Sequence, residues 1–117
     1  MIAAHVVVGS NARARGAALR GLVTSREGRW AVFACALPDT AFDERITVRV
    51  APAGCACCVG LVAFRVALVR LLRETRPDAL AVELVADDHT ERVLATLAEE
   101  SFARVLRVES ITRTDAT

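Results

Sequence analysis

Lysine and tyrosine are missing from this 117-residue chain, and aromatic side chains make up only 4% of it. All 15 basic residues are therefore arginines, so no lysine amine is available to hold a phosphate or to form a Schiff base. Because aromatics are scarce, the hydrophobic core has to be built from Val, Leu, Ala and Ile.

Long uninterrupted apolar runs are also missing. The longest candidate, Val59 to Leu72, contains Arg65 and Arg70, and it is shorter than the roughly 18 apolar residues that suggest a membrane helix. The first residues, Met1 to His5, lack the basic and apolar regions of a signal peptide. The net charge of +1 gives no general attraction to nucleic acid or to anionic lipid. We therefore expect a cytoplasmic protein that binds neither nucleic acid nor membranes.

The order of apolar patterns predicts an α/β fold. With 54% hydrophobic and 25% charged residues, the chain is expected to form one globular domain over residues 1–117. Short apolar runs alternate with segments of helical period, which predicts a three-layer sandwich around a mainly parallel sheet of about five strands. Strands are expected at 3–9, 30–37, 46–50, 79–85 and 103–108, and helices at 17–24, 61–76 and 90–98. Residues 9–16 are expected to form a polar loop, and residues 110–117 a frayed tail.

Three of the four cysteines fall within the motif Gly54-Cys55-Ala56-Cys57-Cys58. Thiolates are strong ligands for Zn²⁺ and other late transition metals. The motif follows the predicted strand 46–50, so it belongs to the carboxyl edge of the sheet, where ligands of open α/β sheets gather. The spacing favours a metal or thiol-redox site over simple packing of small apolar side chains. The separate Cys35 is interpreted as a packing residue, with a weaker alternative as a fourth sulfur ligand.

The order of these features resembles the CobW-like P-loop GTPase and metallochaperone family, relatives of the urease and hydrogenase accessory GTPases. The resemblance is carried by the Gly-Cys-x-Cys-Cys motif after a strand, by the Leu-rich helix that follows it, and by residues 76–83, which end in Glu83. It implies a truncated P-loop NTPase-like fold. It also implies that Cys55, Cys57 and Cys58 are the metal ligands, with zinc or another late transition metal as the cofactor.

The segment aligned with the P-loop, residues 9–16, has lost most of its phosphate-binding residues. Gly9 remains, but Arg15 stands where the family has lysine and Gly16 where it has the Mg²⁺-binding hydroxyl. Ala14 replaces the second glycine, which we expect to strain a position that needs a positive φ. The guanine-specificity motif is absent. We expect no GTP hydrolysis and no productive GTP binding; Arg13 and Arg15, with Gly9 and Gly16, form at most a weak anion site, or simply a solvated turn.

The sequence therefore predicts a metal-binding accessory or carrier domain rather than an enzyme. Two alternatives stay open: a pseudo-GTPase scaffold that pairs with a protein partner or with a second copy of the chain, and a residual nucleotide-binding protein. His89, Asp39, Asp43 and Glu44 are further candidate ligands, although each is typical of solvated loops and helix ends, and His5 is expected to be structural.

Overall fold

The computed structural model describes residues 1–38, 41–51 and 60–115, and it confirms the α/β sandwich. Five strands form one sheet in the order β3-β2-β4-β1-β5, and every neighbouring pair is parallel. The strands are β1 (Ile2–Gly9), β2 (Trp30–Ala34), β3 (Ile46–Val50), β4 (Ala79–Val85) and β5 (Leu106–Arg113). The helices are α1 (Ala12–Thr24), α2 (Gly60–Thr75), α3 (Thr90–Leu97) and α4 (Glu100–Ala103).

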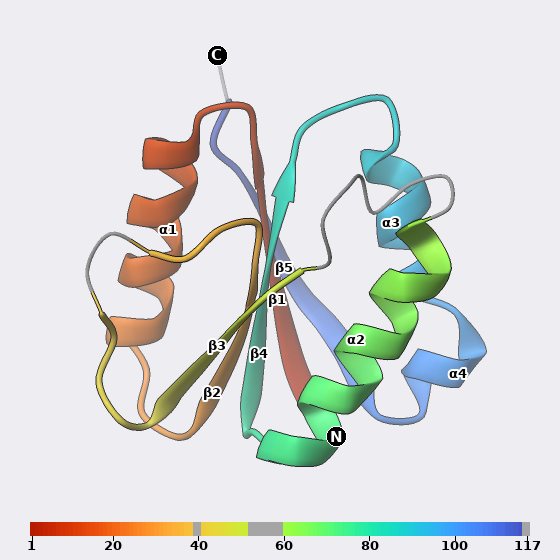
Figure 1. Cartoon of the computed structure of the whole chain (residues 1–117), viewed down its shortest axis with the longest axis horizontal. Coiled ribbons are helices and arrows are strands. Elements are labelled where there is room, and N and C mark those ends of the chain that lie inside the picture. The colour runs from red at the N-terminus through yellow and green to blue at the C-terminus, as the bar shows by residue number, and fades with distance from the viewer. Residues whose placement is uncertain (39–40, 52–59, 116–117) are drawn as a thin grey trace.

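The helices cover both faces of the sheet, as Figure 1 shows, with α1 alone on one side and α2, α3 and α4 on the other. Alternate residues of β1, β2 and β4 supply the two cores. On the α1 side, Leu19 and Val23 pack against Val7, Val32 and Ala81. On the opposite side, a larger core joins the three helices to the sheet. The helices contribute Phe64, Leu68, Leu71, Val93, Leu97 and Phe102 to it, and the strands contribute Val6, Phe33, Val82 and Leu106. The central strands β1, β2 and β4 are buried on both faces, which explains their continuous apolar sequences.

Three element boundaries differ from the sequence-based prediction. Strand β2 ends at Ala34 instead of residue 37, and α1 begins at Ala12, within the expected loop. Strand β5 was expected at 103–108 and instead runs from Leu106 to Arg113. Most residues of β5 are exposed, so the second half of the strand has no buried apolar face and its sequence does not look like a strand. It is a strand because it pairs with β1, from Ile2↔Leu106 to Val8↔Arg113.

Helix α2 ends where the sequence predicted, but in a strained conformation. Arg76, directly before Pro77, has φ 43°, in the left-handed region that favours glycine. Its N–H donates to the Leu72 carbonyl at 2.9 Å, which completes the last turn.

The chain connections define one special position on the sheet. Strands β1 and β4 are neighbours, yet β1 leads through α1 to β2 on one side, while β4 leads through α3 and α4 to β5 on the other. The carboxyl ends of two such strands form the switch point at which open α/β sheets bind ligands. Across the described part of the chain, no helix has the length and apolar character needed to cross a membrane.

Candidate functional site

The turn from β1 into α1 lies at this switch point and is shorter than a P-loop. Only Ser10 and Asn11 separate β1 from α1. The Asn11 side chain caps the helix by accepting a hydrogen bond from the Ala14 N–H at 2.9 Å. Ala14 is therefore helical, and the expected strain at this residue is wrong, because its position requires no positive φ. A short capped turn replaces the wide loop of backbone N–H groups that would surround a phosphate.

Gly9 is needed for close packing between the ends of β1 and β5. The Thr114 N–H donates to the Val8 carbonyl at 2.8 Å, and a Cβ atom added at Gly9 would overlap the Thr114 Oγ1 atom. The Gly9 carbonyl also accepts the Ala86 N–H at 3.0 Å. Gly9, the one P-loop glycine that the alignment retains, therefore has a structural role in this fold.

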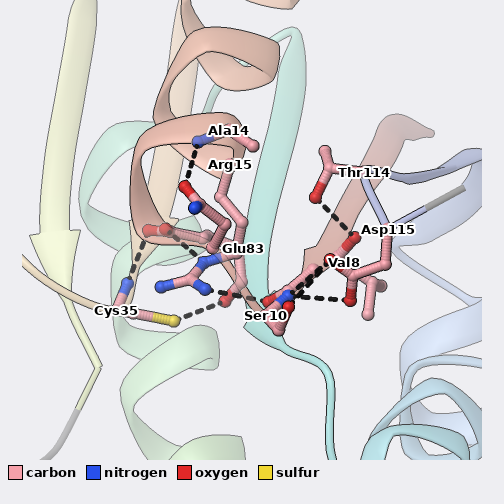
Figure 2. A network of polar contacts seen from close by, with 10 residues as sticks. Val8, Ser10, Ala14, Arg15, Cys35, Glu83, Thr114 and Asp115 are labelled. Carbon is pink, nitrogen blue, oxygen red and sulfur yellow. Dashed lines mark hydrogen bonds and ion pairs between the residues drawn. The ribbon is translucent and has the colours of Figure 1, made fainter.

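Arg15 and Glu83 form a buried ion pair across the switch point, shown in Figure 2. The Arg15 Nε donates to Glu83 Oε2 at 2.8 Å, and the two side chains are only 7% and 8% exposed. Arg15 Nη1 also donates to the Gly9 carbonyl at 2.8 Å. Each of these two buried charges therefore neutralises the other at the switch point of the sheet.

Cys35 completes this network from the end of β2. Its N–H donates to Glu83 Oε1 at 2.9 Å, and its thiol donates to the Glu83 carbonyl at 3.3 Å (Figure 2). Burial, and after it the Glu83 carboxylate, raise the pKa of the Cys35 thiol, although Arg15 opposes this. The protonated, hydrogen-bonded thiol agrees with the packing role expected for this cysteine.

The tail expected to be frayed is instead bound to the β1–α1 turn. Both carboxylate oxygens of Asp115 accept from the Ser10 N–H, at 3.0 and 2.9 Å, and Asp115 Oδ1 also accepts from the Ser10 hydroxyl at 2.9 Å. A side chain of the protein therefore uses the first free backbone donor of the turn (Figure 2). No sequence signal announced this contact, because it joins residues 105 positions apart.

The other Gly and Arg candidates lie on α1. Arg13 and Gly16 are exposed on its first turns, away from the buried Arg15. Of the four predicted anion-site residues, Arg13, Arg15 and Gly16 line one groove beside α1, whereas Gly9 is not among its lining residues and meets Arg15 through its carbonyl.

The candidate ligands outside the cysteine motif are dispersed. His89 precedes α3 and its N–H donates to Asp87 Oδ1 at 2.8 Å. Asp43 pairs with Arg45 at 3.3 Å, Glu44 is exposed, and Asp39 lies outside the described residues. Within residues 1–38, 41–51 and 60–115, no group of three His, Cys, Asp or Glu side chains could hold a metal ion.

His5 is buried, as expected for a structural residue, and makes two polar contacts. Arg26 Nη1 lies 3.2 Å from its Nε2, and Ser110 Oγ lies 2.7 Å from its Nδ1. Because the guanidinium can only donate, Nε2 accepts and the Nδ1–H donates to Ser110, which requires a neutral ring. Burial, and after it the charge of Arg26, lower the pKa of His5, with Glu109 opposing.

Cys55, Cys57 and Cys58 lie in the segment 52–59, outside the described residues. The residues that flank this segment are described. The Ala51 N–H donates to the Ala34 carbonyl at 2.8 Å, immediately before Cys35, and α2 begins at Gly60. The last described residue before the motif, Ala51, therefore lies at the carboxyl end of β3, beside the end of β2.

Comparisons with protein-family models, with curated proteins and with solved structures find no match to this chain.

Proposed function

We propose that this protein is a non-hydrolytic metal-binding domain that holds a thiophilic cation such as Zn²⁺ on Cys55, Cys57 and Cys58. The observation that carries the proposal is the anchoring of Ala51 to Ala34 at the carboxyl edge of the sheet. In the sequence, the motif stands between the end of a parallel strand, β3, and the start of a helix, α2, and connections of this kind are where α/β sheets hold their ligands. Three thiolates in such a short connection offer a soft donor set.

The Arg15–Glu83 ion pair supports the part of the proposal that the domain does not hydrolyse a nucleotide. A phosphate at this position would have to separate two buried charges that already satisfy each other, and leaving either one unpaired is costly. The short turn at Ser10 and Asn11 offers few free backbone donors, since the Ala14 N–H is bound by Asn11 and the Ser10 N–H by Asp115. We therefore expect a carrier or accessory role that needs no nucleotide.

Zinc titration in competition with a chromogenic chelator tests the proposal. We expect one Zn²⁺ per chain with a Kd below about 1 μM, and at least a tenfold loss of affinity in Cys57→Ala, because one of three thiolates is removed. Cys35→Ser is the matched control, since a hydroxyl can replace the thiol as donor to the Glu83 carbonyl, and its zinc affinity should be unchanged. Zinc binding weaker than micromolar, or equally strong in Cys57→Ala, would refute the metal site.

A second candidate, an interaction scaffold, is favoured by the outer face of α2. Val62, Val66 and Val69 follow one another at helical spacing and are 67%, 52% and 36% exposed. If zinc does not bind, sedimentation of the wild-type chain and of Val66→Glu tests this candidate directly. A concentration-dependent complex that Val66→Glu dissociates would support self-pairing through α2. A monomer at all concentrations would exclude self-pairing, so that the scaffold would have to bind a different protein.

A further inference from the structure

A groove of about 550 Å³ lies between α1 and the chain that follows β2. Figure 1 shows this chain passing from the carboxyl end of β2 across to α1. The floor of the groove is apolar, because Val32, Ala34 and Val48 present side chains of β2 and β3 to it. Leu37 and Phe42 line the side opposite the helix. The volume lies within the range of roughly 300–1,000 Å³ that is typical of small-molecule sites.

The charged groups that line this groove are mostly positive. Among the lining residues that the structure describes, Arg13, Arg15 and Arg20 are basic and Glu83 is acidic. Arg15 and Glu83 neutralise each other, and Arg20 lies 4.4 Å from the centre of the Phe42 ring as a cation–π pair. Arg13 is exposed and has no hydrogen bond or ion pair to any residue that the structure describes. The groove therefore combines an apolar floor with a net positive rim.

Glycine at position 16 keeps the groove wide beside the helix. Gly16 lines the groove, and a Cβ atom placed on it would meet nothing within 4 Å. Its neighbours on this wall, Ala12 and Ala17, are also small. Gly16 lies inside α1, where glycine is less favourable than alanine. The small residue that leaves this wall open therefore lowers the stability of the helix.

We propose that this groove binds a small amphiphilic oxyanion, with its apolar body over Val32 and Val48 and its charged group at Arg13. Arginine suits this role because its planar guanidinium binds an oxyanion through two parallel hydrogen bonds. The positive end of the α1 dipole, next to Ala12 and Arg13, adds to the attraction. None of the residues in this proposal belongs to the cysteine motif and the binding requires no metal, so it can be tested independently of the proposed zinc binding.

Fluorescence titration with anilinonaphthalenesulfonate tests this site in the full-length, metal-free chain. Phenylnaphthylamine, which has the same aromatic body without the sulfonate, is the neutral control probe. We expect saturable binding of one sulfonate dye per chain, and at least tenfold weaker binding of the neutral dye, because the neutral dye gains nothing from Arg13 or from the positive end of the α1 dipole. Equal binding of the two dyes, or no binding of the sulfonate, would overturn the proposal.

Two pairs of variants assign the binding to the groove. Gly16→Leu adds a side chain to the groove wall, while Gly21→Leu makes the same change on α1 outside the groove, where a Cβ atom also meets nothing within 4 Å. Both changes raise helix propensity, so neither should lower the melting temperature. We expect Gly16→Leu to weaken dye binding at least tenfold and Gly21→Leu to leave it unchanged.

The second pair concerns charge. Arg13→Gln should weaken binding of the sulfonate dye about fivefold without affecting the neutral dye, whereas Arg107→Gln, an exposed change on β5, should affect neither. Unchanged dye affinity in Gly16→Leu, or equal losses in both members of either pair, would overturn the proposed site.

Discussion

The Arg15–Glu83 pair makes the sharpest prediction about stability. Arg15→Met removes the guanidinium and leaves the Glu83 carboxylate, 8% exposed, with the Cys35 N–H as its remaining partner among the described residues. Glu83→Gln keeps an acceptor for that N–H but turns an amide NH₂ toward the buried Arg15 Nε. Because each change leaves a buried polar group without its partner, each should lower the free energy of unfolding by about 3–5 kcal/mol.

The double variant Arg15→Met, Glu83→Gln isolates the interaction energy between the two side chains from their interactions with other residues. With both charges removed, no unpaired charge remains, so we expect the double variant to be no less stable than either single variant. The coupling energy should therefore have a magnitude of at least about 3 kcal/mol. Urea unfolding followed by the fluorescence of Trp30, the only tryptophan and a buried one, measures these values.

An exposed ion pair of the same kind provides the control. Arg104 and Glu100 are 3.2 Å apart, but their side chains are 77% and 85% exposed, so Arg104→Met should change stability by about 0.5 kcal/mol or less. If the two buried substitutions were additive, with a coupling energy below about 0.5 kcal/mol, the claim that these charges satisfy each other at the switch point would be refuted.

Two further predictions follow from backbone strain and from proton binding. Arg76→Gly should raise the free energy of unfolding by about 1 kcal/mol, because glycine adopts the φ of 43° at the end of α2 without strain; a lower urea midpoint would contradict this. The lowered pKa of His5 means that the folded state favours the neutral ring, so stability should be full above the ordinary pKa of 6.5 and fall as the pH drops below it toward the folded pKa. His5→Gln should lack this part of the acid loss in urea unfolding between pH 7 and pH 5, and an identical pH profile would show that His5 is not responsible.

Part of the candidate site could be predicted because it follows from the order of the strands along the chain. Arg15, Glu83 and Cys35 each come close to the carboxyl end of a predicted strand, and in a parallel sheet these ends meet at one edge. Their ion pair was not predicted, because the sequence does not state that β4 inserts between β1 and β2. That insertion, and not the spacing of the residues, brings Glu83 next to Arg15.

The sequence by itself determined the α/β class and the central strands β1, β2 and β4, because strands buried on both faces require continuous apolar runs, and it determined α2, which requires apolar residues at helical spacing. Only the tertiary structure decided that β5 extends to Arg113, that Asp115 binds the turn at Ser10, and that a groove opens beside Gly16. The physical reason is that apolar periodicity reports local burial. Pairing along an exposed edge strand, contacts between distant residues and unfilled space depend instead on which segments the folded chain brings together.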